Sequence, residues 1–139
     1  MNDEFDLQRF VDAQAPVYEQ VLMELHAGRK TSHWMWFVFP QIDGLGYSSM
    51  AQRYAISGRA EAAAYLKHPV LGARLRECTT LVNAVEARTV HEIFGSPDDL
   101  KFRSSMTLFK ACAEDAEPFA AALEKYFDGL DDPLTLARL

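Results

Sequence analysis

Apolar residues recur at intervals of three and four positions through most of this 139-residue chain. This spacing places their side chains on one face of an α-helix. The clearest example runs from Leu71 to Val85, where Leu75, Cys78 and Val82 complete the apolar stripe. No segment shows a clear two-residue alternation, and a β-strand needs a partner strand. The sequence therefore predicts an all-α fold, with about six to eight helices in a single domain over residues 1–139.

Helix boundaries are indicated by Pro and Gly, and by Ser or Asp at helix starts. Ser96 is predicted to be an N-cap and Pro97 the first residue of its helix, while Ser48 or Ser49 caps an earlier helix. The apolar run 34–39 is interpreted as a buried helical turn, and 61–67 as an Ala-rich turn. The remaining helices are predicted at 7–13, 18–25, 48–56, 71–85, 97–112 and 118–128.

Composition excludes several classes of protein. A chain with 49% hydrophobic residues is not disordered, and the run 34–39 is far shorter than the ~20 apolar residues of a membrane span. The acidic start Met1–Glu4 lacks the basic flank and apolar stretch of a signal peptide. Cys78 and Cys112 are too few for a disulfide framework and are typical of buried reduced thiols. We therefore expect a cytoplasmic protein with no membrane partner.

The charge balance argues against a nucleic-acid partner. The formal net charge is −6, whereas nucleic-acid binding depends on a basic surface that neutralises phosphates. Seven of the acidic residues fall between Glu114 and Asp132. The simplest interpretation of this segment is a solvated face that aids solubility, and the alternative is a surface that meets a basic protein partner.

One candidate site is the long loop after Pro40. Gly44 and Gly46 lie in this loop and Ser48 begins the next helix, so backbone N–H groups and the positive helix end form a candidate anion site. The segment is neither a Walker loop nor a dinucleotide fingerprint, because it lacks a Gly-Lys-Ser/Thr sequence and a third glycine. The alternative is that the two glycines form a tight turn before an ordinary helix cap.

A second candidate is the helix that contains residues 101–109. Ser104 and Ser105 lie on the same side as Lys101, although serine is a poor residue for helix interiors. These hydroxyls either line a polar wall, where Lys101 or Arg103 supplies positive charge to a ligand, or permit close helix packing.

His33, Trp34 and Trp36 form the third candidate cluster. An imidazole can transfer protons near neutral pH, and indole rings can stack against a planar ligand. The alternative is that the cluster belongs to the core, with the imidazole bonded to a backbone carbonyl. His33 is the only candidate catalytic residue, and the sequence leaves open whether the protein is an enzyme.

The spacing of metal-ligating residues gives no support for a metal or a cofactor. His91 and Glu92 begin a zincin-like pattern, but Gly95 stands where the second histidine is required. The histidines and cysteines show no metal-ligand spacing. We therefore expect no metal and no cofactor.

The most specific blocks of the sequence are HWMWFVFPQ at 33–41 and SSMTLF at 104–109. Further blocks lie at 44–46, 54–55, 65–72 and 93–95. Together they resemble a family of small bacterial proteins that is catalogued as a domain of unknown function. The resemblance spans nearly the whole chain and implies a mainly α-helical fold, with no assigned reaction or catalytic residue. Members often carry the label calpastatin, but calpastatin is a disordered inhibitor, whereas this composition predicts a folded chain.

The leading hypothesis is that segments 33–49 and 101–107 converge on one pocket. We expect this pocket to bind a small polar metabolite, anionic or nucleotide-like. The predicted ligand-binding residues are Trp34, Trp36, Gln41, Gly44, Gly46, Ser48, Lys101, Arg103, Ser104 and Ser105. The rival hypothesis is a non-enzymatic protein-interaction module with an acidic C-terminal region. The oligomeric state stays open, since no heptad seam requires a dimer.

Overall fold

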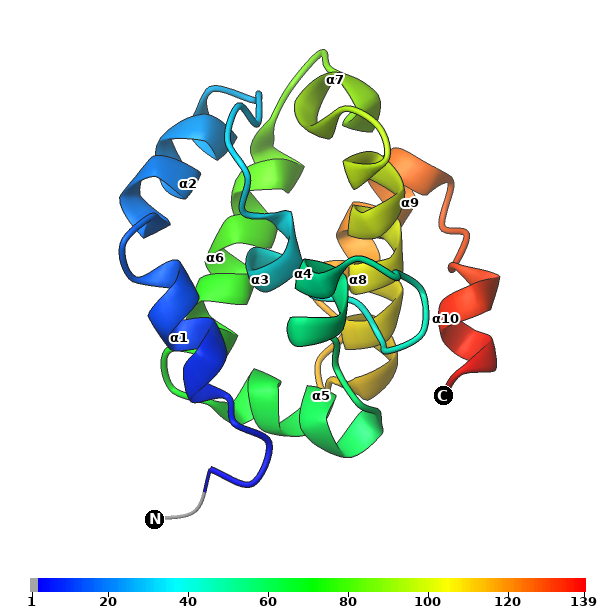
Figure 1. The fold of residues 1–139 in the computed structure, drawn as a ribbon. Helices are drawn as coiled ribbons and strands as arrows, with labels where there is room; N and C mark the ends of the chain where they lie inside the picture. The colour runs from blue at the N-terminus through cyan, green and yellow to red at the C-terminus, as the bar shows by residue number, and fades with distance from the viewer. Residues whose placement is uncertain (1–2) are drawn as a thin grey trace.

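Residues 3–139, which the computed structural model describes, form ten helices and no strand (Figure 1). The helices are α1 (Gln8–Gln14), α2 (Tyr18–His26), α3 (Met35–Val38), α4 (Ser49–Arg53), α5 (Arg59–Lys67), α6 (Leu71–Ala84), α7 (Val90–Phe94), α8 (Asp98–Cys112), α9 (Phe119–Phe127) and α10 (Pro133–Ala137). The start of the acidic segment Met1–Glu4 lies outside the described residues. The predicted all-α fold is confirmed, but the predicted six to eight helices were too few.

The excess over the predicted number comes from short helices. α7 and α10 contain five residues each, which is too short for an apolar repeat to be recognised. The predicted turn at 61–67 is instead the second part of the nine-residue helix α5. Pro97 rather than Ser96 is the N-cap of α8, because the carbonyl of Pro97 accepts the backbone N–H groups of Leu100 and Lys101.

The core is built around α6 and α8. The predicted stripe of α6 is buried at Leu71, Leu75, Cys78 and Val82. α8 is enclosed more fully than its sequence suggests, since all residues of 104–109 are buried. α8 also contacts α5, α7, α9 and α10, so it is the central helix of the fold.

Aromatic contacts fix the segment that contains α3 against α8. The ring of Phe39 meets that of Phe102 edge-on, with centroids 5.0 Å apart, and Phe94 stacks on Phe102 at 4.8 Å. Such pairs stabilise a fold beyond the area they bury. Because Phe39 is held here, the loop that follows Pro40 lies close to the first turns of α8.

The C-terminal segment is attached to α8 by polar contacts. Arg103 donates hydrogen bonds to the carbonyls of Leu130, at 3.0 Å, and Asp131, at 2.7 Å. The backbone N–H of Asp132 donates to the hydroxyl of Thr107 at 2.9 Å. Figure 1 shows α10 beside α8, with the loop before α4 reaching toward it.

These contacts revise the interpretation of the acidic C-terminal region. Glu114 to Asp128 includes five acids that are exposed, as expected for a solvated face. Asp131 and Asp132 are half-buried, and Asp131 forms an ion pair with Lys110 at 3.1 Å. The last two acids therefore belong to the packing of α10 on α8.

Two other expectations concern cysteines and membranes. Cys78 is buried and Cys112 is half-buried, and both are free thiols. Burial raises the pKa of the Cys78 thiol to about 12, so this group stays protonated at neutral pH. Over residues 3–139, no helix has both the length and the apolar character needed to cross a membrane.

Candidate functional site

A pocket of about 560 Å³ lies between the loop before α4, the N-terminal half of α8 and the start of α10. Its apolar lining consists of Leu45, Tyr47, Ala51, Pro97, Leu100 and Leu134. Its polar lining side chains are Gln41, Ser48, Lys101, Arg103, Ser104 and Asp132. The backbone of Gly46 completes the wall. The volume is in the range of small-molecule sites.

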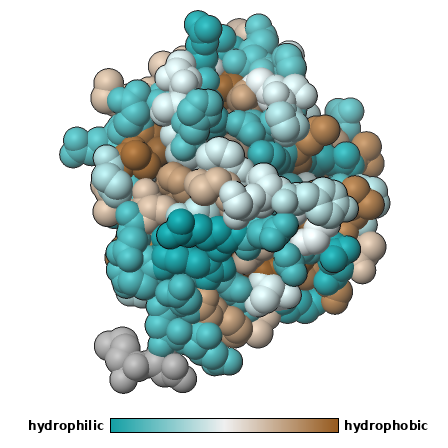
Figure 2. Space-filling view, viewed as in Figure 1, coloured by the Kyte–Doolittle hydropathy of each residue, from teal (hydrophilic) through white to brown (hydrophobic). Residues whose placement is uncertain are grey.

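The apolar part of this pocket is open to solvent. Tyr47 is 85% exposed, Leu100 60% and Leu134 66%. In Figure 2, hydrophobic side chains gather along the edge of the molecule that α10 forms. Large apolar side chains that cluster at a concave surface mark binding sites more often than single exposed residues do.

Six of the ten predicted ligand-binding residues line the pocket, from two segments that are distant in the sequence. They are Gln41, Gly46, Ser48, Lys101, Arg103 and Ser104. Of the two predicted caps, Ser48 and Ser49, Ser48 is the N-cap of α4, and its hydroxyl accepts the backbone N–H of Ala51 at 3.1 Å. The two segments of the leading hypothesis therefore converge, although they bring only part of the predicted set.

Trp34 is not part of the pocket wall. Its side chain is only 1% exposed, and its indole N–H donates to the carboxylate of Glu24 at 3.0 Å. The same carboxylate accepts the backbone N–H groups of Thr31 and Ser32 and the hydroxyl of Ser32. Trp34 thus belongs to the core, and Glu24 fixes the conformation of the 31–34 loop.

The carboxylate of Glu24 is buried in its charged form. Burial by itself raises the pKa of this group, but the hydrogen bonds from Ser32, Thr31 and Gln20 outweigh it and lower the pKa to about 2. Trp34, within the conspicuous block 33–41, therefore has a structural role.

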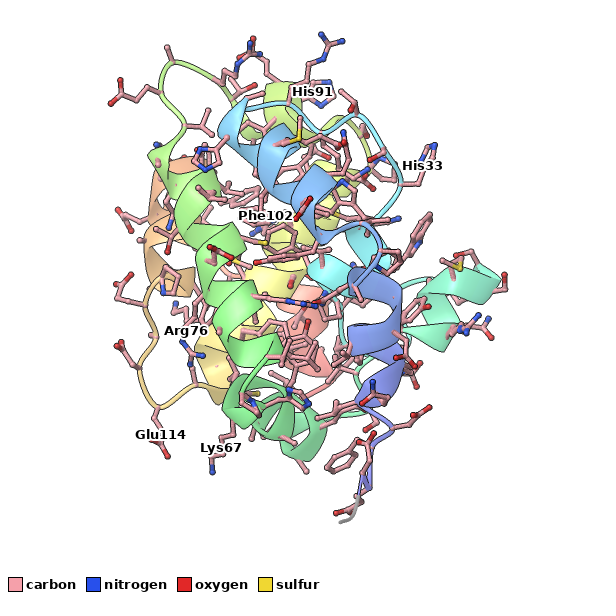
Figure 3. The ribbon with its side chains drawn as sticks, turned by 90° about the vertical axis from the view of Figure 1, so that its left-hand side faces the viewer. His33, Lys67, Arg76, His91, Phe102 and Glu114 are labelled. Carbon is pink, nitrogen blue, oxygen red and sulfur yellow. The ribbon has the colours of Figure 1, made fainter. Side chains whose placement is uncertain are left out.

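His33 lies on the surface, outside the pocket. Its side chain is exposed and projects outward from the loop between α2 and α3 (Figure 3). It does not line the pocket, so the structure does not place the one candidate catalytic residue with the predicted binding residues.

Ser105 and Gly44 also lie outside the pocket lining. Ser105 is completely buried, and its hydroxyl has no hydrogen-bond partner among residues 3–139. Gly44 has a φ of +97°, and a Cβ at this position would overlap the guanidinium of Arg138. That guanidinium donates to the carbonyl of Asp43 at 2.5 Å. Gly44 therefore allows the C-terminal segment to pack against the loop.

Lys101 carries the most available positive charge of the pocket. Its ammonium lies 3.6 Å from one oxygen of Asp98, while the other oxygen of Asp98 pairs with Lys30 at 2.9 Å. This ammonium nitrogen also lies over the ring of Trp36, 5.4 Å from the ring centroid. Trp36 itself does not line the pocket. Because Asp98 is shared and Lys101 remains 25% exposed, its ammonium can bind a further anion.

Arg103 and Ser104 are already engaged with the C-terminal segment. Two nitrogens of Arg103 donate to backbone carbonyls of that segment. The hydroxyl of Ser104 lies 2.8 Å from Asp132 and 3.2 Å from the carbonyl of Leu100, so its proton is not free for a ligand. Both residues position the wall that α10 contributes.

Six apolar lining residues were not predicted to bind a ligand, and Asp132 is the polar pocket residue that was also not predicted from the sequence. One of its carboxylate oxygens accepts the hydroxyls of Ser104, at 2.8 Å, and Thr135, at 2.6 Å. The available signal was the sequence Asp132-Pro133, since an Asp before a Pro is typical of a helix start. The pocket therefore contains a carboxylate as well as positive charge.

No set of three or more His, Cys, Asp or Glu side chains within residues 3–139 is arranged to hold a metal ion. The polar groups of the pocket are instead suited to hydrogen bonds and ion pairs with an organic ligand.

Comparison with known proteins places the whole chain in one family. Residues 4–139 match the family model described as "Protein of unknown function (DUF1810)". Among solved structures, the crystal structure of the conserved hypothetical protein Rv1873 from Mycobacterium tuberculosis is similar, with a TM-score of 0.97 and 59% sequence identity over 99% of this chain and 98% of that one. No curated protein matches the chain. The resemblance indicated by the sequence blocks is confirmed, and this chain belongs to the family described as Protein of unknown function (DUF1810).

Proposed function

We propose that the pocket between the loop before α4, α8 and α10 binds a small anionic molecule with an apolar or planar body, of nucleotide-like size. The observation that carries the proposal is the position of Lys101, whose loosely paired ammonium lines a pocket rimmed by exposed apolar side chains. An ammonium of this kind binds a phosphate or carboxylate, while the rim removes apolar surface of the ligand from water.

The pocket offers a suitable contact for each part of such a ligand. The anionic group is expected at Lys101, and the planar or apolar body against Tyr47, Leu100 and Leu134. The side-chain amide of Gln41 also lines the pocket and can both donate and accept hydrogen bonds. A volume of about 560 Å³ accommodates a molecule of this size.

The direct test is a thermal-shift screen of the purified chain against nucleotides, sugar phosphates and aromatic carboxylates. A ligand at 100 times its dissociation constant stabilises a fold by about 2.7 kcal/mol, which raises the melting temperature by several degrees. Lys101→Ala should abolish this shift. Lys67→Ala is the matched control, because Lys67 is an exposed lysine of α5 outside the pocket (Figure 3).

A protein-interaction module is the second candidate, and one observation favours it. Leu130, Leu134 and Leu136 are all exposed on the C-terminal segment, beside the acids Asp131 and Asp132. A basic partner with an apolar face would complement this surface. If no compound in the screen stabilises the chain at millimolar concentration, or if a shift survives in Lys101→Ala, the metabolite pocket is contradicted.

A further inference from the structure

We infer that the ligand of this pocket carries an exocyclic amino group in addition to its anionic group, and that the carboxylate of Asp132 accepts a hydrogen bond from that amino group. The inference rests on the function proposed above and names the class of ligand.

Asp132 has one engaged oxygen and one free oxygen. Oδ2 accepts both hydroxyl groups, that of Ser104 at 2.8 Å and that of Thr135 at 2.6 Å. Oδ1 accepts no hydrogen bond from any residue of 3–139, although a carboxylate can accept about four in total. The carboxylate is therefore held in place by protein hydroxyls while half of its accepting capacity remains available.

The hydrogen bonds to Oδ2 also restrict rotation of the Asp132 side chain. Ser104 and Thr135 hold Asp132 from two different helices, and the backbone N–H of Asp132 is bonded to Thr107 at 2.9 Å. A carboxylate that is fixed in this way is a specific acceptor, because little conformational freedom is lost when a ligand binds it.

Positive and negative charge therefore stand in the same pocket. Lys101 supplies an ammonium and Asp132 a carboxylate, and both line the cavity. A ligand with only anionic or accepting groups would place one of them beside Asp132 and be repelled. A ligand with an anion at one end and an N–H donor at the other satisfies both residues.

The chemistry that combines these groups with a planar body is an aminopyrimidine or aminopurine nucleotide. Its phosphate would meet Lys101, its base would lie against the apolar rim, and its exocyclic amino group would donate to Oδ1 of Asp132. The corresponding keto nucleotides have the same size and charge, but they present an acceptor where the amino group stands, and their N–H donor lies on the neighbouring ring nitrogen. Matched amino and keto nucleotides therefore test whether the exocyclic amino group is the donor, and their comparison in Asp132→Asn tests whether Asp132 is its acceptor.

The experiment is calorimetric titration of the full chain with two matched pairs, CMP against UMP and AMP against IMP. We expect the amino member of at least one pair to bind at least tenfold more tightly than its keto partner. Asp132→Asn should remove or invert this preference, since the amide oxygen can still accept from Ser104 and Thr135 while the amide NH₂ replaces Oδ1. Asp128→Asn is the matched control, because Asp128 is exposed and outside the pocket.

The outcomes separate this inference from the proposed function. Equal affinity for amino and keto nucleotides, with binding still lost in Lys101→Ala, overturns the role of Asp132 and leaves the anion site intact. Absence of binding by all four nucleotides at millimolar concentration overturns both. If Asp132→Asn does not fold, the comparison of matched nucleotides on the unchanged chain decides the question.

Discussion

The hydroxyl of Ser104 donates a 2.8 Å hydrogen bond to the carboxylate of Asp132, which follows it by 28 positions in the chain. The bond joins α8 to the residue before α10 at a point where both line the same pocket. The wall formed by Asp132 and Leu134 therefore depends on how the C-terminal segment packs on α8. Variants that disturb this docking should change both stability and binding.

Ser104→Ala should destabilise the fold by about 1 kcal/mol, because a hydrogen bond to a charged group is lost while Thr135 still holds Asp132. Urea unfolding at neutral pH measures the difference. Ser105→Ala is the matched control on the same helix. Its buried hydroxyl has no partner among the described residues, so its removal should be neutral or stabilising. A larger cost for Ser105→Ala than for Ser104→Ala would contradict this account.

Arg103→Ala should loosen the C-terminal segment without unfolding the protein. The variant loses the hydrogen bonds to the carbonyls of Leu130 and Asp131, which lead into α10. Hydrogen exchange should become at least tenfold faster at the backbone amides of Asp132 and 134–137, while α6 keeps its protection. Unchanged exchange in 132–137 would show that other contacts hold α10 in place.

Glu24→Gln should destabilise the fold by about 2–3 kcal/mol at pH 7, because a buried carboxylate that accepts several hydrogen bonds is replaced by a neutral amide. Since the pKa of Glu24 in the folded state, about 2, is below its unfolded value, the charge stabilises the fold above the unfolded pKa. That stabilisation is lost as the pH falls toward the folded value.

The difference between Glu24→Gln and the unchanged chain should therefore shrink between pH 7 and pH 3. Unfolding by urea at both pH values measures it directly. A difference that stays constant over this range would mean that the Glu24 carboxylate is not held in its charged form.

Gly72→Ala should be strongly destabilising, with a cost of about 2 kcal/mol or more, because a Cβ at Gly72 would overlap the backbone carbonyl of Leu66. Leu66 lies at the end of α5 and Gly72 at the start of α6, and only residues 68–70 connect these helices, so the short connection leaves little room for the two backbones to separate. Gly58→Ala serves as the comparison. No atom lies within 4 Å of a Cβ at Gly58, and its extended φ suits any residue, so the loss should be about 0.5 kcal/mol from a weaker helix N-cap.

Much of this fold was predictable because its long helices repeat their apolar residues. The stripe from Leu71 to Val82 is buried as expected, and the apolar run 34–39 does contain a short buried helix. α7 and α10 were not predictable in the same way, since five residues give no repeat. Their positions depend on tertiary contacts, such as those from Arg103, that a sequence pattern does not contain.

In the candidate site, too, residues with a local sequence signal were predictable, whereas residues whose roles depend on tertiary contacts were not. Lys101 and Ser48 could be found because a cation and a helix cap have a local chemical signature. Trp34 was assigned to the ligand because the sequence does not reveal that Glu24, ten residues earlier, accepts its indole N–H. Asp132 was missed for the opposite reason, since its partners lie on two different helices and it looked like one acid among many.

Nucleotide binding in this pocket can be tested directly by an NMR titration of the ¹⁵N-labelled chain with AMP and CMP, followed at the backbone amides. We expect the largest shift changes in 41–51, 98–104, Asp132 and Leu134, and we expect them to disappear in Lys101→Ala but persist in Lys67→Ala. Shift changes confined to other parts of the chain, or no change at millimolar nucleotide, would contradict the assignment of this pocket as the binding site.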